Sequence, residues 1–288
     1  MKTLFTMETI WSALRLSIPV AIAALGAIIS ERSGVLNLGL EGMMLTGAFG
    51  GFVVADTTGS AWLGVIAGPL VGALCGALFA LLVVSIRANQ IVTGLAFTLL
   101  ATSATTYLFD RNYNIGNARV DQVPQGALMA LLMVLLAGTW FFLSRTTHGL
   151  ALSAVGESPV AADALGYRVQ RIRWQATMAG GAFAGLAGSA LVCGPLGLFV
   201  RNVTNGRGWI ALALVVFARW RPVPCVVGAL LFGLCDAAQF RLQNTASSVP
   251  YELFLALPYA VTLLALVVRA RVSQPPTALG TPFVRGAS

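Results

Sequence analysis

The sequence is short of the residues that most catalytic and metal sites require. Its 288 residues include one lysine, Lys2, and one histidine, His148. A phosphate-binding loop of the form Gly-x-x-x-x-Gly-Lys-Ser/Thr needs a lysine that reaches the terminal phosphates, and Lys2 follows no such run. A single histidine likewise excludes a zinc-protease helix and any metal site with several histidine ligands. We therefore expect no catalytic residue, no metal, no cofactor and no ATP hydrolysis by such a loop.

Charge and cysteine are also scarce. Charged residues make up 10% of the chain, against about 25% in an average soluble domain. The net charge of +8 comes from arginines spread over short connections, so a nucleic-acid partner is not expected. No Cys-x-x-Cys pair is present, which excludes the usual zinc and redox motifs. The cysteines lie in or beside apolar segments, where they are expected to be buried as small apolar residues: Cys75, Cys193, Cys225 and Cys235.

Apolar residues, by contrast, are abundant. They make up 57% of the chain, and the mean hydropathy is +0.83. Because a helix needs about 20 mostly apolar residues to cross a bilayer, the pattern predicts an all-α polytopic membrane bundle, a single domain over residues 1–288. About nine transmembrane helices are expected, within a range of roughly eight to ten: 9–29, 34–54, 62–84, 90–109, 126–144, 174–193, 208–218, 223–236 and 251–268. The short runs 208–218 and 223–236 are either half-helices or a re-entrant pair.

The arginines indicate an orientation in the membrane. The long connection 145–174 separates the fifth and sixth predicted spans. Placing it in the cytoplasm puts eleven of the eighteen basic residues on the inside, as the positive-inside rule requires. The tail 270–288 is then cytoplasmic, and with nine spans the amino terminus lies outside.

Glycines recur every four residues in two of the predicted spans. One span contains Gly68, Gly72 and Gly76, and another contains Gly181 and Gly185. This spacing places the glycines on one helix face, where they allow two helix backbones to approach closely in lipid. The contact is either between two helices of this subunit or with a second subunit.

Glu41 is an acidic residue within an apolar stretch, whereas most other acidic residues, Glu31 among them, map to connections. An ionisable group at the bilayer centre costs at least about 2.5 kcal/mol, so it usually faces a protein interior or a cavity. If 34–54 is one helix, four residues share a small and polar face of it. They are Asn37, Glu41, Met44 and Ala48. This stripe either binds neighbouring helices and holds the bundle together, or lines a path for a solute.

The connection 145–174 is too polar and basic to cross a bilayer, but part of it favours a helix. Ser158 fits the cap of a helix and Pro159 its first position. Residues 160–165 are good helix formers, and Gly166 is typical of a helix stop. We therefore predict a short helix in a cytoplasmic loop, which is either a connector or a docking surface for a partner.

Five stretches of the sequence together resemble one family. They are residues 31–45 (ERSGVLNLGLEGMML), 156–166 (GESPVAADALG), 206–214 (GRGWIALAL), 257–263 (LPYAVTL) and 276–282 (PTALGTP). Over nearly its whole length the chain is similar to the permease subunits of bacterial ABC importers, in the branch of ribose-type and branched-chain amino-acid permeases. Within that branch it looks like the nucleoside and simple-sugar permeases that work with basic-membrane-protein-type binding lipoproteins. Its amino-terminal part is shorter than that of ribose-type permeases.

The resemblance implies partners and a mechanism. A separate cytoplasmic ATPase would dock on the short helix, and an extracytoplasmic solute-binding lipoprotein would deliver a purine nucleoside, a nucleobase or a simple sugar. A second permease subunit, often non-identical in this branch, would complete a path across the bacterial inner membrane, and ATP-driven alternating access would import the solute. The residues expected to couple to the ATPase are Gly156, Glu157, Ala161, Ala162, Ala164, Leu165 and Gly166.

Two other classes of membrane protein compete with this interpretation. An ion-coupled secondary transporter would use Glu41 as its coupling carboxylate, and a membrane scaffold would transport nothing. The helix predicted within 145–174 favours the ABC permease over both, because only that class needs a docking segment for an ATPase.

Overall fold

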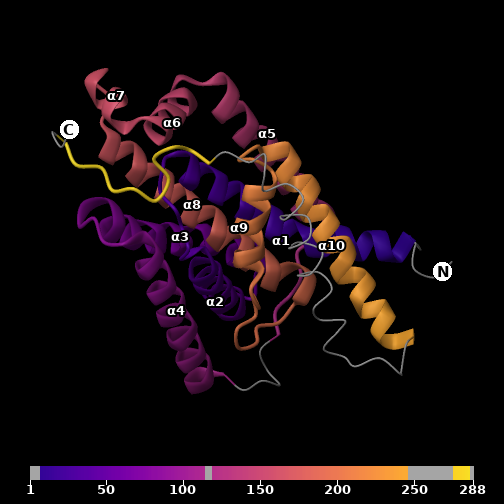
Figure 1. Ribbon diagram of the computed structural model, residues 1–288. Coiled ribbons are helices and arrows are strands. Elements are labelled where there is room, and N and C mark those ends of the chain that lie inside the picture. Colours follow the sequence, from indigo (N-terminus) through magenta and orange to yellow (C-terminus); the bar gives the residue numbers. More distant parts are fainter. Residues whose placement is uncertain (1–6, 114–118, 246–274, 286–288) are drawn as a thin grey trace.

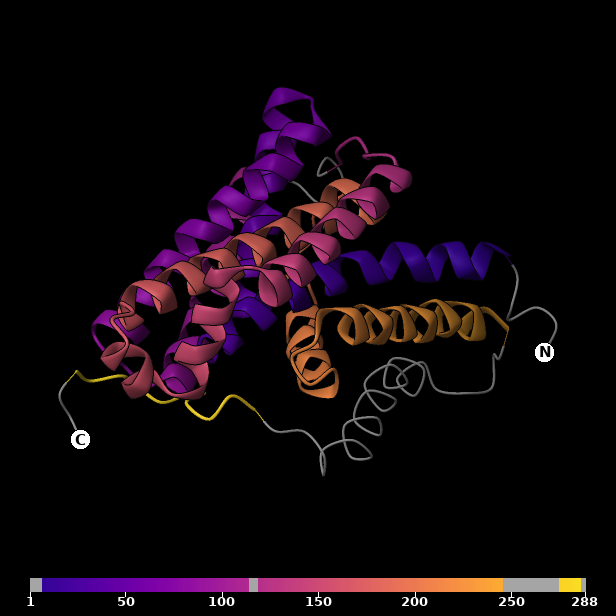
Figure 2. The same ribbon diagram turned by 90° about the horizontal axis from the view of Figure 1, so that it is seen from above.

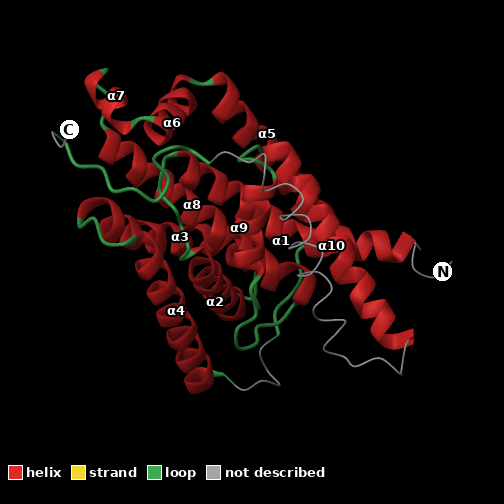
Figure 3. Cartoon of the chain, viewed as in Figure 1, coloured by secondary structure: helices red, strands yellow, loops and turns green. Residues whose placement is uncertain are grey.

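The computed structural model describes residues 7–113, 119–245 and 275–285, and every named element in these ranges is a helix (Figures 1 and 3). The prediction of an all-α bundle is confirmed. Two π-helical segments, η1 (Leu81–Ser85) and η3 (Val192–Leu196), extend α3 and α8. The α-helices are α1 (Met7–Arg32), α2 (Leu40–Thr58), α3 (Ala61–Ala80), α4 (Gln90–Asn112), α5 (Gln125–Arg145), α6 (Thr147–Glu157), α7 (Pro159–Ala164), α8 (Val169–Leu191), α9 (Arg207–Phe217) and α10 (Pro222–Thr245).

Six helical segments in the described ranges are long and apolar enough to cross a membrane. They are Trp11–Arg32, Ala61–Ser85, Gln90–Asn112, Gln125–Arg145, Val169–Leu196 and Pro222–Gln239. The last predicted span, 251–268, lies outside the described residues. The chain is therefore a multi-pass membrane protein, and the count of about nine spans stays a prediction.

The bundle has buried central helices and apolar outer ones. In α1 and α8, 78% and 72% of the most apolar stretch is buried, against 33%, 22% and 17% in α3, α4 and α5. The outer helices expose large apolar side chains, including Leu70, Leu74, Leu99, Leu100, Val134 and Phe141. Surfaces of this kind are suited to lipid or to another subunit rather than to water.

The two glycine-lined faces pack α3 against α8 within this subunit. A methyl group on Gly76 would lie 2.8 Å from the carbonyl oxygen of Thr177. One on Gly185 would lie 2.7 Å from the Cα atom of Gly72, so a larger residue does not fit at either point. The glycine spacing left two alternatives, a contact within this subunit or one with a second subunit. The structure shows the contact within this subunit.

The stretch 34–54 is not one continuous helix. Gly34 has a φ of +88°, and α2 begins only at Leu40. The prediction that Asn37 and Glu41 share a helix face was therefore wrong, since Asn37 precedes the helix and Glu41 lies in its first turn. The physical reason is local: Gly34, in the left-handed conformation, follows the end of α1, and residues 35–39 are not helical.

Only one of the two short predicted runs is a short helix. α9 has 11 residues, whereas α10 has 24 and lies alongside α1 (Figure 2). α9 follows Gly206, which has a φ of +79°. α10 begins at Pro222, a position where proline starts a helix without losing a hydrogen bond. By its length α9 is therefore a half-helix, as one of the two alternatives predicted, whereas α10 is a full-length helix.

Candidate functional site

Glu41 lies where the first turn of α2 meets the start of α9. Its Oε1 accepts hydrogen bonds from the Thr204 hydroxyl at 2.6 Å and the Gly206 N–H at 2.9 Å. Its Oε2 accepts one from the Gly208 N–H at 2.6 Å. The residue is only 4% exposed. Glu41 therefore caps a helix that begins more than 160 positions further along the chain.

The chemistry of a helix start explains this arrangement. The first N–H groups of a helix have no partner inside it, and the helix dipole favours a negative charge there. Hydrogen bonds to a charged acceptor are roughly twice as strong as neutral ones. Gly208 makes the approach possible, because a Cβ atom at this position would lie 2.6 Å from Glu41 Oε2.

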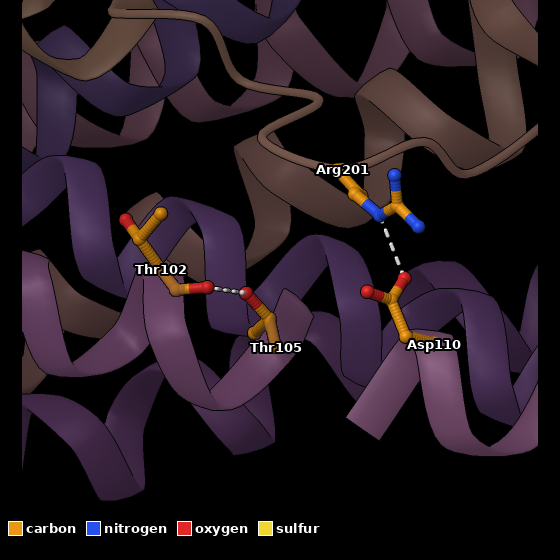
Figure 4. Close-up of polar contacts among 4 residues, drawn as sticks. All are labelled: Thr102, Thr105, Asp110 and Arg201. Atoms are coloured by element: carbon orange, nitrogen blue, oxygen red, sulfur yellow. Dashed lines mark hydrogen bonds and ion pairs between the residues drawn. The ribbon is translucent and has the colours of Figure 1, made fainter. Parts of the chain in front are cut away.

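The loop that leads into α9 is held on its other side by α4. Phe199 is buried among aromatic rings of α2 and α4. Arg201 Nε lies 2.7 Å from Asp110 Oδ1, beside a turn of α4 in which the Thr105 hydroxyl donates to the Thr102 carbonyl (Figure 4). Both partners of the ion pair are largely exposed, so it contributes only about 0–1 kcal/mol. The aromatic contacts are the stronger part of this anchor.

A second charged pair lies beside the cap. Arg207, the first residue of α9, has its Nη2 atom 3.4 Å from Asp236 Oδ2 of α10, and both side chains are mostly buried. The Nε atom of Arg207 has no hydrogen-bond partner among the described residues. Because either charge alone would be costly in a low-dielectric interior, the pairing compensates both. The start of α9 is thus tied to α2 by Glu41 and to α10 by Arg207.

The other three residues of the predicted path are fully buried in this subunit. Asn37 donates from Nδ2 to the Met43 sulfur at 3.5 Å, and its Oδ1 has no partner within the described ranges. Met44 and Ala48 face α8, where a methyl group on Gly188 would lie 2.7 Å from the Ala48 nitrogen. The four residues therefore lie in the packed interface between the 37–48 segment and its neighbours.

Glu31 is a second buried glutamate, although the sequence placed it in a connection. It lies in the last turn of α1, is 2% exposed and accepts a hydrogen bond from Trp220 Nε1 at 2.6 Å. Trp220 belongs to the turn after α9 and has a φ of 54°, which is uncommon for a residue other than glycine. Glu31 thus holds the end of α9 as Glu41 holds its start. The partners are 189 positions apart, so the local sequence carried no signal for this contact.

The short helix predicted within 145–174 is present as α7. Ser158 is its cap, with Oγ accepting from the Ala161 N–H at 3.4 Å, and Pro159 is its first residue. Gly166 follows its end with a φ of +89°. A further helix, α6, precedes α7 and was not predicted.

The residues expected to couple to an ATPase divide into an outward and an inward set. Ala161, Ala164 and Leu165 are exposed, Leu165 by 77%. Val160 was not among the residues expected to couple to an ATPase, but it lies beside them and is 62% exposed. We call Val160, Ala161, Ala164 and Leu165 the α7 face. Inward, a methyl group on Gly156 would meet the Arg32 carbonyl, and Ala162 packs with Val155 and Val169.

Residues 275–285, which we call the C-terminal strap, run along α6 and α7 to the turn after α1 (Figure 1). The Ala278 N–H donates to the Gly156 carbonyl at 2.9 Å, and the Gly280 N–H donates to the Gly34 carbonyl at 3.1 Å. Three side-chain contacts add to these: Thr277 to Glu157 (3.0 Å), Arg285 to Asp163 (3.1 Å) and Arg173 to the Thr281 carbonyl (2.7 Å). The sequence predicted a tail here but not its contacts.

Comparison with known proteins gives one family. Residues 9–266 match the model of a family described as branched-chain amino acid transport system, permease component. A putative glucose ABC transporter permease of Haloferax volcanii is 43% identical, over 77% of this chain and 74% of the relative. A guanosine ABC transporter permease of Bacillus subtilis is 33% identical over 93% of both chains, and a nucleoside ABC transporter permease of Lactococcus lactis is 29% identical over 93% and 94%.

Among solved structures, an inward-facing putative metal-chelate type ABC transporter matches with a TM-score of 0.54. The match covers 90% of this chain and 85% of the other, at 17% identity. At this identity the likeness concerns the fold alone.

Proposed function

Because the chain belongs to the family of branched-chain amino acid transport permease components and is the membrane subunit of an ABC transporter, we propose that it imports a nucleoside or a related small polar solute. The observation that carries the proposal is full-length similarity to permeases named for guanosine and for nucleosides. Because one relative is named for glucose, the proposed class of solutes includes simple sugars, which share a hydroxyl-rich ring with nucleosides. The chain itself is a translocation subunit and not an enzyme.

The partners form part of the same proposal. A cytoplasmic ATPase docks on the α7 face, since Val160 and Leu165 are large apolar side chains exposed on a short capped helix at one end of the bundle. A second, non-identical permease subunit completes the path. An extracytoplasmic solute-binding lipoprotein delivers the solute, and the assembly lies in the bacterial inner membrane.

Alternating access then requires that movement of α7 reaches the helices at membrane depth. The end of α6, directly before α7, is bonded to the C-terminal strap through the Gly156 carbonyl and Glu157, and the exposed Asp163–Arg285 ion pair adds only weakly to this. The strap is in turn bonded to the turn after α1. At the end of α1, Glu31 binds the turn after α9 through Trp220. At its start α9 is bound to α2 through Glu41. A displacement of α7 is therefore passed to both ends of α9.

In this proposal Glu41, Met44 and Ala48 do not contact the solute. They fix α2 against the neighbouring helices. Asn37 has a side-chain carbonyl oxygen without a described partner, but the residue is fully buried, so a solute hydroxyl reaches it only in a state in which the segment before α2 has moved. Ion coupling through Glu41 is disfavoured, because the carboxylate is buried and already holds three donors.

The test is uptake of labelled guanosine and glucose by proteoliposomes that contain this chain with its ATPase, its permease partner and the binding protein. We expect uptake of one of these solutes that requires both ATP and the ATPase subunit. Uptake that persists without the ATPase and collapses with a proton uncoupler would overturn the ABC mechanism. ATP-driven uptake of leucine alone would leave the mechanism standing and reject the solute class.

A further inference from the structure

A pocket of about 740 Å³ opens between α1, α5, α6 and α8, and no residue of the Glu41 cap lines it. Its volume lies within the ~300–1,000 Å³ range of small-molecule sites. Ile29, Phe142, Leu152 and Phe183 make much of its wall apolar. The pocket is therefore large enough for a specific ligand and takes no part in the contacts proposed for transport.

The pocket runs lengthwise along α8. The lining residues of this helix recur at three- and four-residue steps from Ile172 to Phe183, which places them on one stripe. Eleven residues at 1.5 Å each correspond to about 16 Å, close to half of the ~30 Å hydrocarbon core of a bilayer. A groove of this length and polarity fits one acyl chain within a single leaflet.

Polar groups gather at one end of this groove. His148 of α6 and Tyr167 of the turn before α8 line it there, with Gln175 nearly two turns into α8. This is also the end of the bundle that carries α7, which we proposed above to be cytoplasmic. The groove therefore has an apolar body within the membrane and a polar end at its surface.

Three arginines lie at this polar end, on the same helix faces of α5 and α8 as the residues that line the pocket. Arg168 and Arg171 lie four residues before lining residues of α8, and Arg145 lies three residues after a lining residue of α5. All three are exposed. Within the described ranges no acidic side chain forms an ion pair with any of them, and Arg145, whose Cζ lies 6.0 Å from the ring centroid of Trp140, keeps its N–H donors for an anion. The polar end therefore has a positive charge that is available to an anion.

We propose that this pocket binds an anionic phospholipid of the membrane, with one acyl chain along α8 and the phosphate among Arg145, Arg168 and Arg171. The outer side of α5 exposes Val134 and Phe141, so the pocket lies next to a face suited to lipid. Basic pockets between transmembrane helices on the cytoplasmic side suit the headgroups of anionic lipids. An apolar groove one leaflet long, with arginines at its end that form no ion pair among the described residues, selects a molecule that carries both chemistries.

The headgroup is tested by lipid binding to the purified full-length chain in a neutral detergent. Dioleoyl-phosphatidylglycerol and dioleoyl-phosphatidylcholine have the same chains and differ in headgroup charge, and bound lipid is counted by native mass spectrometry. We expect the anionic lipid to bind at least tenfold more tightly. Each of Arg145→Gln and Arg171→Gln should weaken its binding roughly fivefold and leave the zwitterionic lipid unchanged. Equal binding of the two lipids would overturn the proposal.

The pocket itself is tested by filling it. A Cβ atom on Gly138, which lines the pocket, meets nothing within 4 Å, so Gly138→Leu blocks the groove without a backbone clash. Gly126→Leu is the matched control, because Gly126 is equally open on the same helix and lies outside the pocket. We expect Gly138→Leu alone to abolish the rise in melting temperature that phosphatidylglycerol produces. Unchanged lipid binding in Gly138→Leu, or conversion of a dimeric particle to a monomer by that variant, would overturn the assignment to lipid.

Discussion

A carboxylate in a membrane protein is stabilised by the groups that surround it, and for Glu41 two of the three donors belong to the main chain. Backbone N–H groups at a helix start hold a fixed direction, so they need little ordering when the carboxylate binds. In return α9 gains the acceptors that its first turn lacks. The free-energy cost of burying the Glu41 carboxylate is thus offset by its position at the N-terminus of α9, where the helix dipole favours a negative charge.

Replacing Glu41 by glutamine tests this cap. Glutamine keeps one oxygen but turns an NH₂ group toward a donor, so Glu41→Gln leaves a buried N–H unsatisfied and removes the charge. We expect the free energy of unfolding to fall by about 2–3 kcal/mol, measured by thermal or denaturant unfolding of the purified full chain in detergent. Thr204→Val, which removes one donor to the charged carboxylate but leaves both main-chain donors in place, should cost about 1.5 kcal/mol. Equal stability of Glu41→Gln and the unaltered chain would show that the cap contributes nothing.

The sequence predicted some residues of the site and missed others for a physical reason. Ser158 and Pro159 act within their own helix turn, so their roles could be inferred from a few neighbouring letters. The apolar surroundings of Glu41 predicted that it must have protein partners, but Thr204 and Gly208 lie more than 160 positions away. Glu31 shows the same limit, because Trp220 becomes its partner only when α1 and α9 pack together.

Among the secondary-structure elements, the close-packing glycine faces of α3 and α8 were predictable because they depend on a spacing. Glycines four residues apart lie on one helix face whatever the partner is. Which partner they meet was left open, since a spacing does not say whether the second helix belongs to the same chain. The start of α2 was missed for a different reason: a mostly apolar run continues through residues 34–39, whereas the left-handed conformation of Gly34 breaks the helical backbone.

An alanine at Gly185 tests how much this close packing contributes. Its methyl group would lie 2.7 Å from the Cα atom of Gly72, so α3 and α8 must separate. We expect Gly185→Ala to lower the free energy of unfolding by about 1–3 kcal/mol. Gly138→Ala is the control, since its methyl group meets nothing within 4 Å and alanine favours a helix by up to about 1 kcal/mol. If both variants melt at the same temperature, the glycine contact is not a determinant of stability.

In the whole molecule, the contacts of the stretch 31–45 connect elements that are distant in sequence. Its first glutamate, Glu31, binds the turn after α9, and its second, Glu41, binds the start of α9. Between them, Gly34 accepts a hydrogen bond from the C-terminal strap. One short stretch therefore contacts the strap and both ends of α9. Composition predicted the class of fold, but this convergence depends on tertiary packing.

The C-terminal strap leads to the last prediction, since it joins α7 to the turn after α1. Deleting residues 275–288 removes the Asp163–Arg285 ion pair, the two main-chain bonds to Gly156 and Gly34 and the Thr281 acceptor of Arg173, so that among the described residues only the direct packing of Gly156 on the Arg32 carbonyl still joins the end of α6 to α1. We expect the assembled transporter to insert and to hydrolyse ATP, while solute uptake per ATP falls at least tenfold. A chain that lacks only residues 286–288 keeps the strap and should transport normally. Full uptake by the longer deletion would show that α7 acts on the bundle through α6 and α8 alone.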